Sequence, residues 1–170
     1  MWNRPLHAAV PAALVLCALA GLAQPALAAL GGSPMPTPTG ATATTLNPTA
    51  RAAAQSASAS VASSSSSYSV RSTAYSTGTQ VREYIGAGGA VFGIAWNGPR
   101  MPDLQTLLGN YFPQYASGVK AQRAVRHARG PVAVEQSDLV VHSGGHMGSF
   151  FGQAWLPSAL PAGITGADIK

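Results

Sequence analysis

The residues that could do metal or nucleophilic chemistry are few and gather near the C-terminal end. His142 and His146 have the H-x-x-x-H spacing that puts two imidazoles on one face of a helix, as a metal site needs. Gly144 and Gly145 instead favour a two-residue hairpin turn, which pairs Ser143 with His146 and points the histidines to opposite sides of a sheet. A bulged turn would reverse this. We predict ordinary strand or turn histidines and no metal site.

Two further combinations have the residue types of hydrolases. Asp138, Ser143 and His146 include the types of a nucleophilic triad, but no G-x-S-x-G elbow occurs in the chain. Glu83 and Glu135 are the only glutamates, and a carboxylate pair hydrolyses glycosides only where the two flank a cleft. We assign no catalytic residue and no cofactor. The alternative is a small hydrolase that uses His146 with Asp138 or a glutamate.

A basic stretch is the first candidate for binding. Lys120, Arg123 and His127 fall within about 60° on a helical wheel, and Arg126 and Arg129 extend the basic character. Such a patch suits an anionic envelope surface or polysaccharide. The solvated face of a packed helix is the simpler interpretation.

Aromatic residues are the second candidate. Tyr111, Phe112 and Tyr115 lie close together in the sequence, where they could line a ligand groove or pack in the core against Trp96. With His146, the residues to test first are therefore Trp96 and Tyr111, followed by the basic side chains Lys120, Arg123 and Arg126.

Strand-like runs flank the helical region that carries Tyr111 and the basic candidates. The runs at 68–75, 79–85 and 90–96 are separated by turn signals and predict an antiparallel meander whose third strand is central. After the helical region, strand patterns return at 132–135, 139–143 and 146–156.

Asp103 is placed to cap a helix in which Leu104, Leu107 and Leu108 have helical spacing. A second helical stretch runs over about 113–128 and stops at Gly130. We predict an α+β fold: an antiparallel sheet of a three-strand meander and a C-terminal hairpin, with the helices packed on one face.

The N-terminal part predicts export. An apolar run of about 15 residues, shorter than the roughly 20 of a membrane helix, precedes an Ala-x-Ala site, so residues 1–28 have the pattern of a secretory signal peptide. An uncleaved anchor and lipidation of Cys17 are the alternatives. We expect a periplasmic or secreted protein with no transmembrane segment after cleavage.

Composition divides residues 29–170 into two parts. Residues 29–67, rich in Ser, Ala, Thr and Pro, are expected to be disordered, and 68–170 to form a single domain. Cleavage would remove the only cysteine and leave nine basic and five acidic residues, a net charge of +4. A mature chain without cysteine can form no disulfide, and a net charge of +4 is too weak to indicate a nucleic-acid partner.

Several short motifs resemble, as a set, a family of small exported bacterial proteins known as a domain of unknown function. The resemblance covers about 68–170 together with the signal peptide and 29–32, and the Ser/Ala tract looks like an insertion. It implies export from a Gram-negative cell and brings no catalytic role; His142 is not part of the pattern. The motifs are V-R-E-Y at 81–84, A-W-N-G-P at 95–99, P-D-L at 102–104, L-G-N-Y-F at 108–112, S-G-G-H-M at 143–147 and L-P-A-G at 160–163.

The sequence thus favours a non-enzymatic binding or scaffolding domain of the cell envelope. A structural envelope protein without a small ligand is a further possibility.

Overall fold

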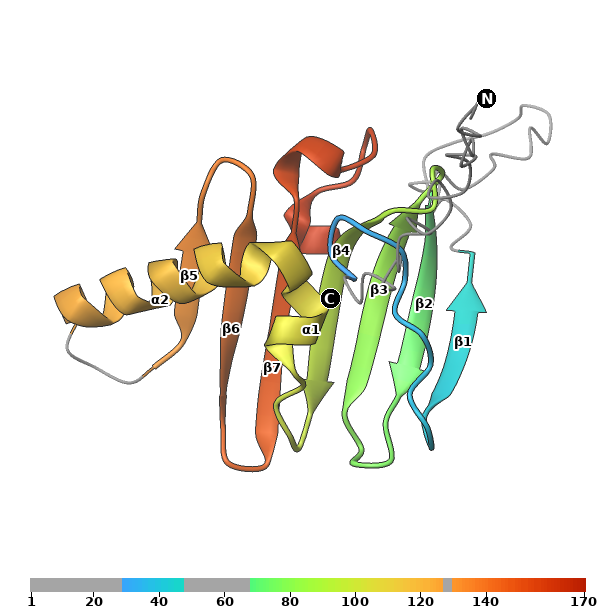
Figure 1. The fold of residues 1–170 in the computed structure, drawn as a ribbon, viewed down its shortest axis with the longest axis horizontal. Helices are drawn as coiled ribbons and strands as arrows, with labels where there is room; N and C mark the ends of the chain where they lie inside the picture. The colour runs from blue at the N-terminus through green and yellow to red at the C-terminus, as the bar shows by residue number, and fades with distance from the viewer. Residues whose placement is uncertain (1–28, 48–67, 127–129) are drawn as a thin grey trace, which may run out of the picture.

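Seven strands form one antiparallel sheet in the order β1-β2-β3-β4-β7-β6-β5 (Figure 1). The computed structural model describes residues 29–47, 68–126 and 130–170. The strands are β1 (Thr42–Leu46), β2 (Tyr68–Ala74), β3 (Gln80–Gly86), β4 (Val91–Gly98), β5 (Val132–Glu135), β6 (Val140–His146) and β7 (Ser149–Trp155). The predicted α+β class, the meander and the central position of its third strand, β4, are confirmed.

The two helices pack on one face of the sheet, as predicted. The N–H of Gln105 donates to Oδ1 of Asp103 at 3.0 Å and caps α1 (Leu104–Leu108). Gly109, at φ +50°, ends α1 and begins a single 3-10 turn (Gly109–Tyr111), after which α2 (Phe112–Arg126) follows. Leu107, Leu108 and Tyr115 join the main core, and we call this side of the sheet the helix face. No helix among the described residues is long and apolar enough to span a membrane.

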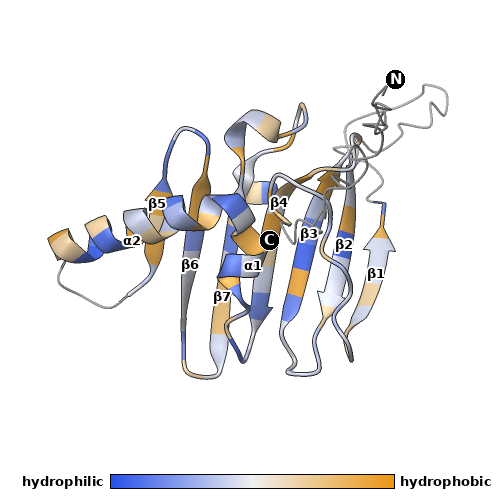
Figure 2. Cartoon of the chain, in the orientation of Figure 1, coloured by the Kyte–Doolittle hydropathy of each residue, from blue (hydrophilic) through white to orange (hydrophobic). Residues whose placement is uncertain are grey.

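The opposite face of the sheet is covered only in part. The segment 156–170 folds back across β3 and β4 with two short 3-10 turns (Pro157–Ala159 and Gly166–Asp168), and Ile169 is fully buried against Tyr84, Phe92 and Ala95. Central β4 is therefore covered on both sides, which explains its nearly continuous apolar run. Figure 2 shows hydrophobic and hydrophilic bands along neighbouring β3. Gly166 of the segment also packs on Trp155 at the end of β7. We call the remaining part of this face, over β5, β6 and the rest of β7, the open face.

The C-terminal hairpin turns at a different place from the predicted one. Gly144 and Gly145 lie inside β6, His146 pairs with Ser149, and the turn residues are Met147 and Gly148. Gly148 has φ +83°, the conformation that a tight turn requires and glycine adopts at little cost. The prediction that His142 and His146 point to opposite sides is therefore wrong: four residues apart on one strand, they share a face.

The reason is that Gly144 serves packing, not turning. A Cβ at Gly144 would lie 3.0 Å from Cζ of Phe151, its partner on β7. The glycine pair makes room for the neighbouring strand, and such a requirement is invisible in a local turn pattern.

The prediction of disorder over 29–67 is wrong for 29–47. Ala29 and Leu30 are buried, and the N–H of Leu30 donates to the carbonyl oxygen of Leu107 at 3.1 Å. Met35 is also buried, and β1 extends the sheet through pairing with β2. β-branched threonines favour this strand. The folded domain thus begins well before residue 68, while the predicted signal peptide at 1–28 and the tract at 48–67 lie outside the described residues.

Candidate functional site

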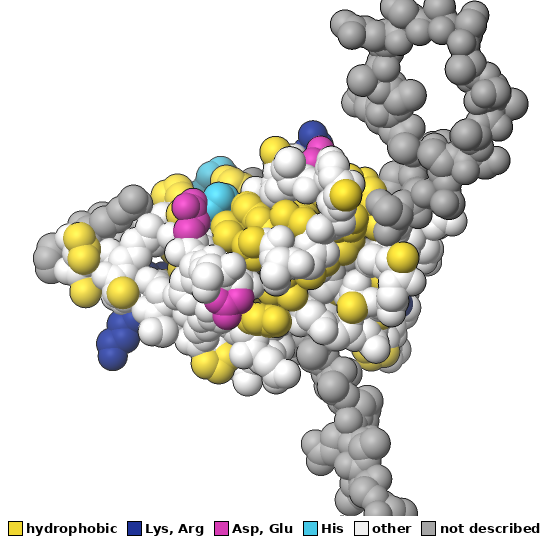
Figure 3. All heavy atoms as spheres, turned by 90° about the horizontal axis from the view of Figure 1, so that it is seen from above, with side chains coloured by type: hydrophobic (Ala, Val, Ile, Leu, Met, Phe, Trp, Pro, Cys, Tyr) yellow, Lys and Arg dark blue, Asp and Glu magenta, His cyan; other side chains and the backbone are white. Residues whose placement is uncertain are grey.

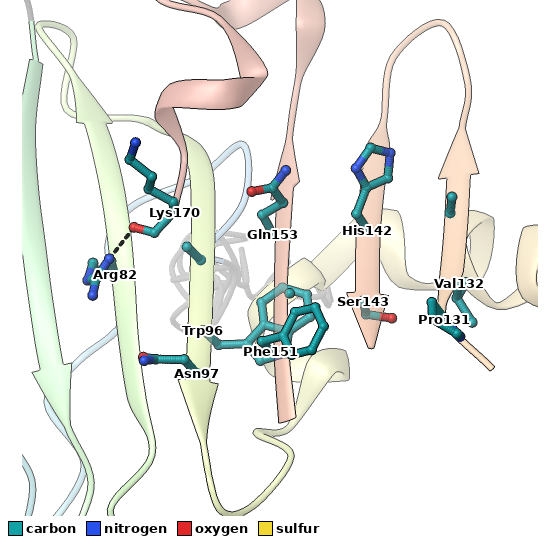
Figure 4. Close-up of a pocket in the computed structure, with 13 residues that line it drawn as sticks. Arg82, Trp96, Asn97, Pro131, Val132, His142, Ser143, Phe151, Gln153 and Lys170 are labelled. Atoms are coloured by element: carbon teal, nitrogen blue, oxygen red, sulfur yellow. Dashed lines mark hydrogen bonds between the residues drawn. The ribbon is translucent and has the colours of Figure 1, made fainter. Parts of the chain in front are cut away.

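A groove of about 540 Å³ lies on the open face and reaches from the segment 156–170 across to β5 (Figure 4). We call it the open-face groove. Its apolar and small lining residues are Ala95, Trp96, Pro131, Val132, Ala133, Phe151 and Gly152, and its polar ones are Arg82, Asn97, His142, Ser143, Gln153 and Lys170.

One row of cross-strand neighbours forms the base of the groove. Arg82 on β3 pairs with Ala95, Ala95 with Gln153, Gln153 with His142, and His142 with Ala133. Directly paired residues of antiparallel strands point to the same face, so the sheet register alone assembles these five side chains.

A second row runs beside the first and presents an aromatic ring. Asn97 on β4 pairs with Phe151 on β7, which pairs with Gly144 on β6. The ring of Phe151 lies against Gly144, and the residue is 56% exposed. A phenyl ring in this position is available for contact with a ligand.

His142 is held at the β5 side of the groove by two neighbours. Its Nε2 lies 3.0 Å from Oε1 of Glu135 on adjacent β5, and its ring stands edge-on to that of Trp155, with centroids 5.3 Å apart. A carboxylate that bonds one ring nitrogen fixes the orientation of an imidazole. His142 therefore presents a positioned ring rather than a freely rotating one.

The end of the described chain closes the other side of the groove. Nη1 of Arg82 donates to the carbonyl oxygen of Lys170 (Figure 4). The hydroxyl of Tyr84 donates to the same oxygen at 2.8 Å and accepts from the N–H of Lys170 at 3.0 Å. These bonds fix the backbone of Lys170 beside Arg82, and both cationic residues line the groove.

Trp96 lines the groove but is only 2% exposed. Its ring packs against Gly152, its partner on β7, where a Cβ would lie 2.3 Å from Cζ2. Nε1 of Trp96 is buried and finds no hydrogen-bond acceptor within the described ranges. A buried donor without a partner is unusual in proteins and marks this indole as a feature to explain.

His146 lies apart from the acids with which a hydrolase would need it. It is exposed at the end of β6, and its Nδ1 lies 3.1 Å from the carbonyl oxygen of Met147. Asp138 precedes the other end of β6 and bonds Ser137. At about 3.3 Å per residue, the eight positions from Asp138 to His146 separate the two residues by roughly 25 Å.

The other hydrolase residues are also separated. Ser143 is buried on the helix face, where its Oγ shares a 3.3 Å hydrogen bond with the hydroxyl of Tyr115. Glu135 contacts His142 rather than His146, and Glu83 is fully buried under the N-terminal segment. Within the described part of the chain, no group of three or more His, Cys, Asp or Glu residues could hold a metal ion.

The remaining candidates lie on the helical side. Tyr111 is half-buried and packs on the core, 2.9 Å from where a Cβ of Gly31 would lie. Lys120 and Arg123 are exposed on α2, close to Val125, which is 81% exposed. Figure 3 shows basic and hydrophobic side chains together at the end of the molecule that α2 forms. The side chain of Arg126 lies outside the described residues.

A second hollow of about 550 Å³ lies between the N-terminal segment and the loop before α1. Two of its polar residues already serve the fold: Thr79 donates to the carbonyl oxygen of Arg100 at 2.8 Å, and Asp103 caps α1. We therefore take the open-face groove as the candidate site.

Arg82, Phe151 and Gln153 of the groove escaped the sequence analysis. The alternation of Phe151, Gln153 and Trp155 along one strand was a usable signal. The sequence analysis did not use this alternation, because it placed the hairpin turn three residues too early and therefore paired the residues of β6 with the wrong partners on β7.

A search of curated proteins and a search of solved structures each found no match. Residues 26–169 match a family that is described as a protein of unknown function (DUF2844). The match takes in the N-terminal segment that the structure joins to the sheet, as well as both sides of the open-face groove. Because it covers most of the 170 residues, the chain belongs to the DUF2844 family.

Proposed function

We propose that this chain is an exported, non-enzymatic binding domain of the cell envelope that holds its partner in the open-face groove. The observation that carries the proposal is the cross-strand row from Arg82 to Ala133, which brings polar side chains from three strands to one solvent-facing base. Clefts that combine apolar walls with a few convergent polar groups are the usual form of a binding site.

The arrangement of titratable groups supports binding over catalysis. General acid–base chemistry needs a side chain within hydrogen-bond reach of the reacting group and of a partner that tunes it. His146 has only the carbonyl oxygen of Met147 as a bonded neighbour. Among the described residues, the single His–carboxylate contact is His142 with Glu135, and the adjacent Ser143 is buried on the opposite face of the sheet.

The signal-peptide pattern at 1–28 supports the location, and the exposed cations Lys120 and Arg123 supply a second contact. This contact suits an anionic envelope surface, and at exposed sites it is screened by salt. It lies on the helix side, so the domain can be held at a surface while its groove stays accessible.

The test is retention on envelope material. Full-length protein and the variant Phe151→Ala are passed over immobilised envelope fractions from a Gram-negative cell, with Met147→Ala as the control because Met147 is exposed, apolar and outside the groove lining. We expect Phe151→Ala to reduce retention and Met147→Ala to leave it unchanged. Equal retention of both variants would refute the groove as the binding site.

A further inference from the structure

The open-face groove is rich in hydrogen-bond donors. Arg82 and Lys170 carry cationic groups, Asn97 and Gln153 carry amides, and His142 adds an imidazole. No Asp or Glu belongs to the lining residues. This set favours a ligand that offers oxygen acceptors and carries negative charge, because donors without acceptors in a cleft lose their hydrogen bonds to water.

Two cationic residues line one side of the groove. Arg82 uses Nη1 to hold the carbonyl oxygen of Lys170, so the backbone of Lys170 is fixed beside the guanidinium. The remaining guanidinium N–H groups suit a carboxylate, which they bind in a fork geometry. The side chain of Lys170 points away from the guanidinium (Figure 4), so its ammonium supplies a separate positive charge for a ligand with more than one carboxylate.

The exposed ring of Phe151 adds a flat apolar surface between these polar groups. The face of a phenyl ring carries partial negative charge and attracts C–H groups. A sugar ring offers C–H groups on its face and hydroxyls at its edge. The amides of Asn97 and Gln153 both donate and accept, as hydroxyl partners require. Asn97 is the direct cross-strand partner of Phe151, and Gln153 lies two residues further along β7.

The length of the groove favours a chain of sugars over one ring. Its row spans five adjacent strands, and strand spacings of about 4.8 Å give roughly 19 Å from Arg82 to Ala133. Single-stranded nucleic acid is less favoured, because it is bound by successive stacking aromatics along a basic track. The groove has one exposed phenyl ring, that of Phe151, and two cationic residues, Arg82 and Lys170.

Building on the proposed function, we propose that the groove binds an acidic polysaccharide, with Phe151 under a sugar ring and Arg82 and Lys170 on its carboxylates.

The probe is an oligogalacturonate, a short chain of sugars that each carry a carboxylate, titrated into full-length protein by calorimetry; a neutral malto-oligosaccharide of equal length is the comparison. Two matched pairs of variants distinguish binding in the groove from binding elsewhere on the surface. Lys170→Gln is compared with Lys120→Gln, since both remove one exposed cation, and Phe151→Ala with Met147→Ala, since both remove an exposed apolar side chain. Unfolding temperatures verify that each variant folds.

We expect the acidic probe to bind at least tenfold more tightly than the neutral one, and Phe151→Ala and Lys170→Gln each to weaken binding about tenfold. The control variants bind as the parent does. Equal affinity for both sugars, no measurable binding, or equal losses in controls would overturn the inference. A single-stranded nucleic acid is titrated in the same way. If it binds and oligogalacturonate does not, the inference of a polysaccharide ligand is wrong. The proposed binding domain would still stand if envelope retention depends on Phe151.

Discussion

The ring of Trp96 lies directly against the α-carbon of Gly152 on the neighbouring strand. A Cβ at Gly152 would meet Cζ2 of Trp96 at 2.3 Å and the carbonyl oxygen of His142 at 2.7 Å. Since one obstacle is backbone and the other a buried ring, neither moves without disturbing β4 or β6. The contact ties the helix-face core to the strand that carries Phe151 and Gln153.

Gly152→Ala is therefore expected to destabilise the domain by about 3 kcal/mol, as overpacking in a rigid core does. For a domain of this size that lowers the unfolding temperature by roughly 10 °C. Thermal unfolding followed by circular dichroism measures it. Gly88→Ala is the control, because nothing lies within 4 Å of a Cβ there. An unchanged unfolding temperature for Gly152→Ala would contradict the packing described.

Glu83 predicts a pH dependence of stability. Burial raises the pKa of Glu83, while the N–H of Met35, which donates to Oε1 at 2.8 Å, and the Arg71 guanidinium, 3.7 Å from Oε2, oppose the shift. The folded state thus binds the proton more tightly than the unfolded chain. This stabilisation is present in full below the ordinary pKa of glutamate and is lost as the pH rises through the raised value.

Glu83→Gln should remove this dependence, because the amide keeps an acceptor for Met35 and does not ionise. The unfolding free energy of the parent, relative to the variant, is expected to fall between about pH 5 and about pH 8. Urea unfolding at both pH values measures the difference. Parallel curves for the two proteins would show that Glu83 does not titrate as its surroundings require.

The basic surface of α2 predicts salt-dependent attachment. Neutralising Lys120 and Arg123 together as Lys120→Gln and Arg123→Gln should weaken association with anionic envelope fractions at low salt, by up to about thirtyfold if each exposed cation contributes near 1 kcal/mol at a charged surface. The difference from the parent should vanish at about 1 M salt, where the Debye length is near 3 Å. Unchanged sedimentation with the envelope at low salt would remove α2 from the contact surface.

His146 is predicted to be dispensable. His146→Ala and Asp138→Ala remove exposed side chains whose only described bonds are local, so each should change stability by less than about 0.5 kcal/mol and leave envelope retention unaltered. His142→Ala, in contrast, should reduce retention, because it removes a ring that lines the groove. A hydrolytic activity of the parent that His146→Ala abolishes would instead establish the hydrolase hypothesis.

The sequence predicted the parts of the fold that local patterns encode. The meander followed from alternation bounded by turn residues, and Asp103 was recognised as a cap because its chemistry is local. The docking of 29–35 was missed because the partners of Leu30 and Met35 are distant: Leu107 and Glu83 lie 77 and 48 positions further along the chain. A polar, proline-rich composition gave no indication of such contacts.

The candidate site was only partly predictable for a related reason. It consists of side chains that the register collects from several strands, and the register of β6 with β7 depends on the turn at Met147 and Gly148. Gly144 resembled a turn residue but makes room for Phe151. Trp96 was identified as a candidate, whereas its neighbours in the groove required the pairing of β4 with β7.

The most direct test of the binding groove is the pair of side-chain amide resonances of Asn97 and Gln153 in the full-length protein, assigned through Asn97→Ala and Gln153→Ala and followed as solubilised envelope polysaccharide is added. Both residues line the groove from the open face, so the two resonances should shift together. Shifts confined to α2 or to the β6–β7 turn, with both groove signals unmoved, would contradict the account.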